Sequence, residues 1–139
     1  MPRVQQQEDN MSDLTFPEGF LFHPEHTWLR VNPDGTAHVG ISDFAQDQLG
    51  EVAFVDLPAV GAEFEAGGEF GTVESIKAVN SLFMPVAGKV LAVNEALSDD
   101  PSAVNTSPYG DGWMLHIAPA SSDDAAKLMD GATYKGTLA

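Results

Sequence analysis

Short apolar runs, separated by glycine and proline, make up most of the chain between residues 14 and 120. Such spacing is typical of β-strands joined by tight turns, and it predicts a mainly β fold. The clearest unit is a hairpin in which residues 27–31 and 36–41 flank the sequence Asn32-Pro33-Asp34-Gly35. In that turn proline fixes φ and glycine permits a positive φ, so two antiparallel strands are expected.

Further strands are predicted at residues 52–57, 70–76, 79–83, 90–93 and 113–118. The first of these is almost continuously apolar and ends at a proline, which predicts a buried strand. In 113–118, apolar side chains at odd positions alternate with Met114 and His116, which predicts one inward and one outward face. The segment 94–112 contains two prolines and is predicted to be a long irregular loop with room for a helical turn.

Two short helices are predicted among the strands. Ser42 is suited to cap a helix that Gly50 ends. Near the C-terminus, Ser122 is suited to cap a second helix over residues 123–130, which has acids in its first turn and Gly131 just past its end. Many short strands with few and short helices favour a small sandwich or barrel.

Composition narrows the function before any motif is considered. The chain has 139 residues, with 21 Asp and Glu against 6 Lys and Arg, a net charge of −15 and no cysteine. This length predicts a single domain, which we place at residues 14–139, after a polar tail over 1–13 that we expect to be disordered. So acidic a chain is unsuited to nucleic acids and to anionic membranes. Without cysteine it has no disulfide and no thiol nucleophile of its own.

The sequence also bears on location. No apolar run approaches the ~18 residues of a membrane span. The tail contains three consecutive glutamines and lacks the layout of a signal or transit peptide. A cytoplasmic location is therefore expected, with the mitochondrial matrix as the alternative for a processed eukaryotic chain. Met1 and Met11 are both candidate starts.

Motifs for catalysis are weak. His23 and His26 are three residues apart with Glu25 between them, a spacing that can serve a metal, but no zinc-type framework surrounds them. There is no Gly-x-Ser-x-Gly elbow and no phosphate-binding loop ending in Gly-Lys-Ser/Thr. We expect no metal site and no enzymatic activity, and a small metal hydrolase that uses these histidines stays open as an alternative.

Lys77 differs from the other five cations in its setting. It lies in Glu74-Ser75-Ile76-Lys77-Ala78-Val79, between two predicted strands, and glycine-punctuated segments flank it on both sides. An exposed hairpin lysine is common and needs no special function. This layout nevertheless places the amine on a protruding turn, where a modifying enzyme can reach it and from which an attached group can move between active sites.

Several segments together resemble the H proteins of the glycine cleavage system, from Phe20 to about Gly131. In chain order they are His23-Pro24-Glu25-His26-Thr27-Trp28, Val39-Gly40-Ile41-Ser42-Asp43-Phe44-Ala45-Gln46, Leu49-Gly50-Glu51-Val52, Val55-Asp56-Leu57-Pro58, Val73-Glu74-Ser75-Ile76-Lys77-Ala78-Val79-Asn80, Pro85-Val86-Ala87-Gly88, and Val104-Asn105-x-x-Pro108-Tyr109-Gly110-x-Gly112-Trp113. Each segment is modest alone, but together and in this order they are highly specific.

The resemblance implies a mainly β barrel-sandwich hybrid of the lipoyl/biotinyl-domain type, with short helices that include one near the C-terminus. It also implies that Lys77, on a hairpin, carries lipoic acid through an amide bond. The chain would then be a non-catalytic swinging-arm carrier in glycine catabolism. It would take the aminomethyl group of glycine from glycine decarboxylase (P protein) to an aminomethyltransferase (T protein), and dihydrolipoyl dehydrogenase (L protein) would reoxidise it.

The resemblance implies a further partner, the lipoylating enzyme. Glu74 is the acid nearest to Lys77 in the sequence and is a candidate recognition residue for that enzyme. The alternative for Glu74 is an ordinary solvated acid at a strand end. Because a shuttle must enter several active sites, we expect a monomer.

Three places in the chain depart from the family pattern, around the cleft that shelters the loaded arm. Thr27 stands where many members have glutamate, Asp43-Phe44 where an aromatic residue or histidine is frequent, and Ser81 where an acid is frequent. Two other carrier functions stay open: an H-like relay that passes lipoate to 2-oxoacid dehydrogenases, and a biotin carrier. Biotinylated lysines usually lie between two methionines, whereas Ile76 and Ala78 flank Lys77 here.

Overall fold

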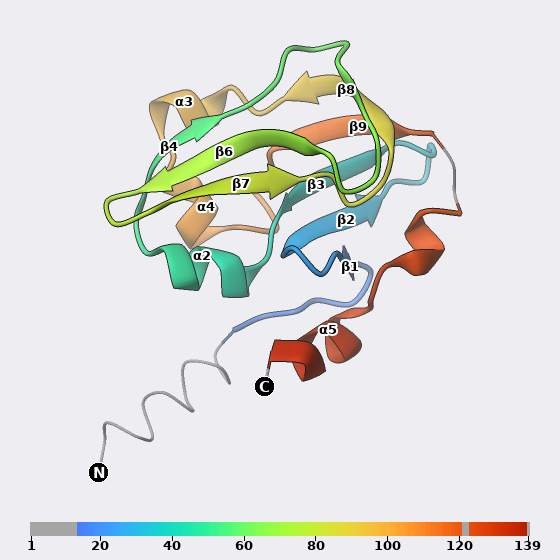
Figure 1. Ribbon diagram of the computed structural model, residues 1–139, viewed down its shortest axis with the longest axis horizontal. Coiled ribbons are helices and arrows are strands. Elements are labelled where there is room, and N and C mark those ends of the chain that lie inside the picture. The colour runs from blue at the N-terminus through green and yellow to red at the C-terminus, as the bar shows by residue number, and fades with distance from the viewer. Residues whose placement is uncertain (1–13, 121–122, 139) are drawn as a thin grey trace.

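The computed structural model describes residues 14–120 and 123–138; the tail over 1–13 and Ser122 lie outside the described residues. Its strands form two antiparallel sheets in two layers (Figure 1). The larger sheet has the order β1 (Leu21–Phe22), β2 (Thr27–Val31), β3 (Ala37–Ile41), β9 (Leu115–Pro119), β8 (Gly88–Val93) and β5 (Glu63–Phe64). The smaller sheet has the order β4 (Val52–Asp56), β6 (Glu69–Ser75) and β7 (Val79–Phe83). The predicted mainly β architecture is confirmed.

Short helices connect these strands. They are α2 (Asp43–Leu49), α3 (Ala96–Asp99), α4 (Ala103–Thr106), the 3₁₀ turn η1 (Ala125–Lys127) and α5 (Gly131–Leu138). The first helix forms as predicted, since Ser42 Oγ accepts a hydrogen bond from Ala45 N at 3.1 Å and Gly50 ends the helix with φ of 75°. The segment 94–112 is less irregular than expected, because it contains α3 and α4. None of the helices in the described ranges has both the length and the apolarity of a membrane span.

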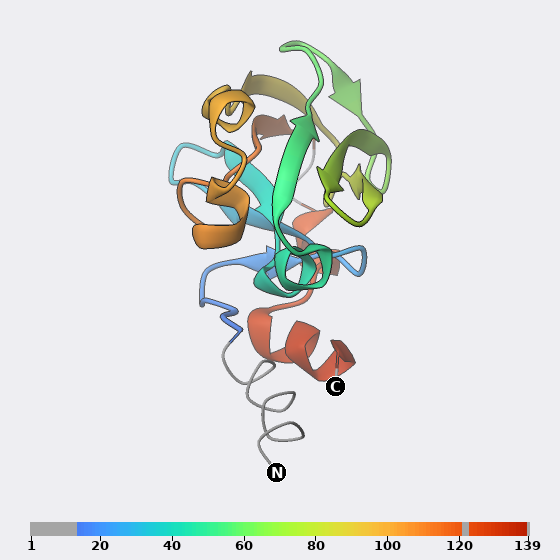
Figure 2. The ribbon, with the colours of Figure 1, turned by 90° about the vertical axis from the view of Figure 1, so that its left-hand side faces the viewer.

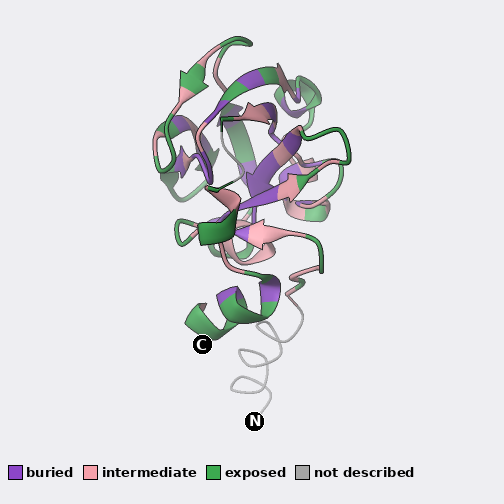
Figure 3. Cartoon of the chain, turned by 90° about the vertical axis from the view of Figure 1, so that its right-hand side faces the viewer, coloured by how far each residue is buried: buried purple, intermediate pink, exposed green. Residues whose placement is uncertain are grey.

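The core lies between the two sheets. Val39 and Ile117 from the larger sheet and Val73 and Leu82 from the smaller one are buried in a single apolar cluster. A second buried cluster, made of Phe22, Trp28 and Tyr134, joins α5 to the larger sheet. In Figure 3 the buried segments lie on the central strands, and the exposed ones on turns and on much of α5. The hairpin predicted around Asn32-Pro33-Asp34-Gly35 is confirmed, with β2 and β3 in register from Thr27 opposite Ile41 to Val31 opposite Ala37.

The predicted bounds of the C-terminal helix were wrong. Residues 123–130 contain only the turn η1, and α5 begins at Gly131 instead of ending before it. The chain is extended at Leu128, and Met129 forms a β-bridge with Phe22 through two backbone hydrogen bonds of 2.7 and 2.9 Å. This pairing with a strand more than a hundred residues earlier prevents the local helical pattern from forming.

Gly131 is required by a close contact rather than by the end of a helix. A Cβ at this position would lie 2.6 Å from the Phe16 carbonyl oxygen, so a larger residue would push the N-terminal segment away from α5. Asp130 provides the cap, since its Oδ1 accepts a hydrogen bond from Thr133 N at 2.8 Å. An acid that was predicted to end one helix therefore begins the next one.

Two strands also differ from their predictions. Strand β4 was expected to be buried, but only Val52 and Val55 are, and the Phe54 side chain is 52% exposed. A register shift between Val52 and Phe54, at the edge of the smaller sheet, turns Phe54 to the outside. Strand β9 begins two residues later than predicted, at Leu115, and Met114 is fully buried, so the expected alternation fails there.

Candidate functional site

Lys77 lies at the tip of the hairpin between β6 and β7, as the sequence predicted; this tip points toward the viewer in Figure 2. Ser75 fixes the backbone of the turn from within. Its N–H donates to the Ala78 carbonyl at 2.8 Å, and its Oγ accepts from Lys77 N at 3.3 Å and from Ala78 N at 3.1 Å. Lys77 itself is exposed. The turn is therefore held in place while its lysine side chain is accessible.

The lysine side chain lies over the end of α2. A Cβ built on Gly50 would be 3.4 Å from Lys77 Cε and 3.8 Å from Nζ. Asn105 links the end of α2 to the start of β4. Its Nδ2 donates to the Gly50 carbonyl at 2.8 Å, and its Oδ1 accepts from Val52 N at 2.8 Å. Among the described residues Lys77 forms no ion pair, so no carboxylate there neutralises it.

We expect Asn105→Ala to lower the free energy of unfolding by about 2–3 kcal/mol, because it leaves the Val52 N–H and the Gly50 carbonyl without their partner. Urea denaturation followed by circular dichroism measures this loss. Asn80→Ala is the matched control, since Asn80 is exposed and is expected to change stability by less than about 0.5 kcal/mol. Equal losses in the two variants would contradict the role given to Asn105.

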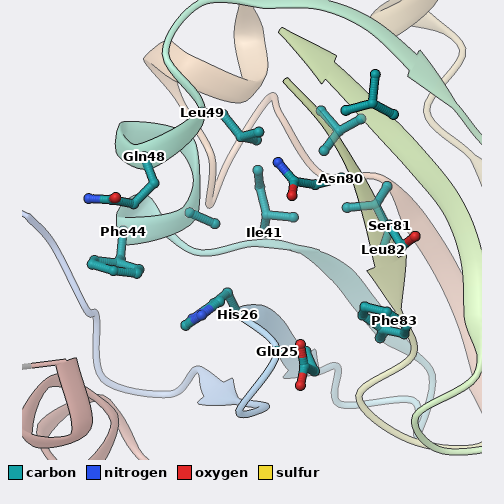
Figure 4. Close-up of a pocket in the computed structure, with 13 residues that line it drawn as sticks. Glu25, His26, Ile41, Phe44, Gln48, Leu49, Asn80, Ser81, Leu82 and Phe83 are labelled. Atoms are coloured by element: carbon teal, nitrogen blue, oxygen red, sulfur yellow. The ribbon is translucent and has the colours of Figure 1, made fainter. Parts of the chain in front are cut away.

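A cleft of about 630 Å³ opens between α2 and β7 (Figure 4). Its apolar wall includes Ile41, Phe44, Leu49, Val79, Leu82 and Phe83. Its polar groups are Glu25, His26, Gln48, Asn80 and Ser81. Lys77 stands two residues before Val79, the first residue of β7, so its side chain starts next to this cleft. An aliphatic arm with a polar end would match such walls.

Two of the three positions that depart from the family pattern line the cleft. Phe44 and Ser81 do so, whereas Thr27 is 1% exposed and its Oγ1 donates to the Phe83 carbonyl at 2.9 Å. Thr27 therefore serves the fold. Among the lining residues Glu25 is the one carboxylate. From the sequence, the histidines were candidate metal ligands, and Glu25 and His26 stood in a segment that resembles the family, but neither had a predicted role in the cleft; their nearness in sequence to Thr27 was the available signal.

The histidines do not form a metal centre in the part of the chain that the structure describes. No group of three or more His, Cys, Asp or Glu side chains there is suited to hold a metal ion. His23 Nδ1 accepts a hydrogen bond from Glu25 N at 3.0 Å, and His26 Nδ1 lies 2.7 Å from the Tyr134 hydroxyl. Both Nδ1 atoms are thus occupied within the fold. The metal hydrolase alternative has no geometric support.

Glu74 lies on the outer face of the smaller sheet and is exposed. In the strand register it stands between Phe54 on β4 and Val79 on β7, whose side chains are 52% and 62% exposed. Ile76, next to Lys77, is 81% exposed. An acid flanked by exposed apolar side chains, three residues from Lys77, is a surface suited to a protein partner.

A separate polar cluster lies on the larger sheet. The His38 and His116 rings stack with centroids 4.7 Å apart, and His38 Nδ1 accepts from Arg30 Nη2 at 3.1 Å and from Asn32 Nδ2 at 3.0 Å. Burial, followed by the positive charges of Arg30 and His116, lowers the pKa of His38, which the negative charge of Asp34 partly offsets. This cluster does not line the cleft.

The lowered pKa of His38 predicts acid sensitivity. In the unfolded chain His38 binds a proton near pH 6.5, whereas in the folded chain its imidazole stays neutral to lower pH. The contribution of His38 to stability is therefore complete above about pH 6.5 and is lost as the pH falls below that value. We expect urea unfolding to give a smaller free energy at pH 5.5 than at pH 7.5. In His38→Gln the difference should shrink without vanishing, because burial also lowers the pKa of His23 and His26. Unchanged dependence in that variant would contradict the assignment.

Comparison with known proteins relates the chain to a single protein family. Residues 20–139 match the family model described as "Glycine cleavage H-protein". The glycine cleavage system H protein of Bacteroides thetaiotaomicron is 46% identical over 125 residues, which cover 90% of this chain and 98% of that one. The H protein 2 of Pseudomonas syringae pv. tomato is 49% identical, with coverages of 88% and 95%.

A solved structure agrees with these relatives. The crystal structure of a glycine cleavage system H protein from Mycobacterium marinum superposes with a TM-score of 0.81 and 35% sequence identity. The match covers 88% of this chain and 98% of that chain. The two-sheet architecture with a C-terminal helix is therefore shared with that protein.

Proposed function

Since this chain belongs to the glycine cleavage H-protein family, we propose that Lys77 is the residue to which its lipoic acid is attached. As an H protein the chain is a non-catalytic lipoyl carrier in glycine cleavage. The observation that supports Lys77 is its place: it is exposed, at the tip of a turn held by Ser75, beside a largely apolar cleft. These relatives do not favour the lipoyl relay or the biotin carrier.

The residues around Lys77 fit such a group. When bound, the lipoyl group would supply a dithiolane able to take up the aminomethyl group of glycine, and the dithiol that remains after transfer would be reoxidised to the ring. Formation of an amide removes the charge of Lys77 Nζ, and within the described residues this breaks no ion pair. The apolar cleft walls bind an aliphatic arm and exclude water from it. Glu25, as the one carboxylate in these walls, attracts a cationic amine that enters.

The partners are the other proteins of the glycine cleavage system, the P, T and L proteins. We propose that the lipoylating enzyme recognises Glu74, because this acid is exposed, three residues from Lys77, and in register between two exposed apolar residues. A net charge of −15 favours rapid, polar and reversible contacts over a large apolar interface. The preference for polar contacts over a large apolar interface also supports a monomer. We propose a cytoplasmic location as well.

Mass spectrometry of the wild-type chain tests the attachment site. The chain is produced in cells supplied with lipoate, and its intact mass is compared with that from cells unable to lipoylate proteins. We expect one lipoyl-sized increment, and peptide mapping is expected to place it between Ile76 and Ala78. An unmodified chain, in cells whose other lipoyl proteins are modified, would overturn the proposal.

A further inference from the structure

A buried chain of hydrogen bonds joins the C-terminal helix to the cleft. The Tyr134 side chain, on α5, is fully buried. Its hydroxyl lies 2.7 Å from His26 Nδ1 and 2.8 Å from Ser42 Oγ. Ser42 Oγ in turn accepts from Ala45 N, the bond that caps α2. His26 is a wall residue of the cleft (Figure 4), so α5 reaches the cleft through one phenol group.

The donors and acceptors of this chain fix the position of each proton. Ser42 is fully buried, so its hydroxyl proton needs an acceptor. Of its two neighbours, Ala45 N–H can only donate, and Tyr134 is therefore the acceptor. The phenol proton of Tyr134 then goes to the remaining partner, His26 Nδ1. In the neutral ring Nδ1 is consequently the acceptor, and the proton is on Nε2.

We propose that Tyr134 is a positioning residue of the cleft: it fixes His26 as the neutral Nε2–H tautomer, a hydrogen-bond donor for an acceptor atom of the lipoyl-lysine arm. This inference rests on the proposed function, since the arm supplies the acceptor. With Nδ1 occupied by Tyr134, Nε2 is the ring nitrogen left for a ligand, and it has no hydrogen-bond partner among the described residues.

Two further observations indicate that the fold constrains the orientation of the His26 ring. His26 is a non-glycine residue with φ of 77°, a left-handed conformation that persists only where surrounding contacts hold it. The Phe44 ring packs against it with centroids 5.2 Å apart. The ring is thus held by Tyr134 on one element and by Phe44 on another, while its backbone adopts an unfavourable conformation.

The same chain of hydrogen bonds opposes protonation of His26. An imidazolium would donate from Nδ1, so Tyr134 would have to accept that proton and donate its own to Ser42. The Ser42 hydroxyl proton would then lose its acceptor in a fully buried place. Burial also lowers the pKa of His26, and the negative charge of Glu25 offsets part of this lowering.

Nitrogen-15 NMR of the full-length chain, without lipoate, tests the tautomer directly. Long-range proton–nitrogen correlations in the wild type should identify His26 Nδ1 as unprotonated and Nε2 as protonated. In Tyr134→Phe both nitrogens should shift toward values of mixed tautomers, and the His26 titration midpoint should rise. Tyr109→Phe is the matched control, because that hydroxyl bonds Asp43 N and the Thr15 carbonyl and does not contact His26, so the wild-type pattern should persist.

A protonated Nδ1 in the wild type, or an unchanged pattern in Tyr134→Phe, would overturn the proposal. If Tyr134→Phe does not fold, the wild-type spectrum decides the tautomer and Ser42→Ala checks the proton order: the buried Tyr134 proton still has His26 Nδ1 as its acceptor there, so the Nε2–H pattern should persist, and mixed tautomers would contradict the proposal. The lipoylated wild-type chain gives the second readout. The NMR signal of the His26 Nε2 proton should shift on lipoylation, and an unshifted signal would contradict the hydrogen bond to the arm. Lipoylation itself is followed by mass, so a failed attachment is told apart from a failed hydrogen bond.

Discussion

Lys77→Arg is expected to abolish the lipoyl-sized mass increment completely, and with it all transfer of the aminomethyl group by this chain. Arginine keeps the positive charge, but its guanidinium stays protonated and delocalised at neutral pH and does not form the amide that a lysine amine forms. Because Lys77 is exposed and forms no ion pair among the described residues, the substitution should leave the fold intact. Intact mass and far-ultraviolet circular dichroism of the same sample measure both points.

Lys89→Arg is the matched control for this experiment. Lys89 is also an exposed lysine, but it lies within β8, in register with Glu63 on β5 and Ala118 on β9, and not on a turn. The variant should carry the full increment. An increment that persists in Lys77→Arg, or disappears in Lys89→Arg, would move the attachment away from the β6–β7 hairpin.

Gly71→Ala is expected to destabilise the protein by about 3 kcal/mol or more, near the upper end for an overpacked position. A Cβ at Gly71 would lie 2.1 Å from the Asp56 carbonyl oxygen, so the paired strands β4 and β6 would have to separate. Because β6 leads into the Lys77 turn, the extent of lipoylation should fall as well. Thermal and urea unfolding measure the first effect, and intact mass measures the second.

Gly136→Ala separates this steric clash from the general effect of replacing a glycine. Nothing lies within 4 Å of a Cβ at Gly136, which is in α5, and alanine is favoured there by up to about 1 kcal/mol. This variant should be as stable as the wild type or slightly more so. A similar loss of stability in Gly71→Ala and Gly136→Ala would contradict the close approach of β4 and β6.

Local structure was predictable where its causes are local. The hairpin at Gly35 and the helix capped by Ser42 are specified by turn and cap residues within a few positions, and both form. The turn that carries Lys77 was predicted from the two strands on either side of it and from the glycine-punctuated segments that flank them. The C-terminal helix failed because its limits are set from far away, by the pairing of Met129 with Phe22 and by the contact of Gly131 with Phe16. No pattern within 123–138 contains that information.

The candidate site was predictable only in part. Lys77 follows from sequence order, but the cleft beside it is assembled from the segment at Glu25, from α2 and from β7, which the fold brings together. Family resemblance pointed to Phe44 and Ser81, and it also pointed to Thr27, which is buried outside the cleft wall. The part played by Tyr134 had no signal in the sequence, because a buried tyrosine there is indistinguishable from any other core aromatic residue.

The turn held by Ser75 makes the base of the arm a fixed pivot. Travel of a group attached to Lys77 then comes mainly from rotation about single bonds of the side chain and its extension, because the backbone of the turn is restrained. The radius of the region that the arm can search is thereby set by its own length. Each partner enzyme must bring its active site within that radius by the way it docks, so misoriented encounters yield no reaction, and selection among partners is made at the protein surface before any chemistry begins.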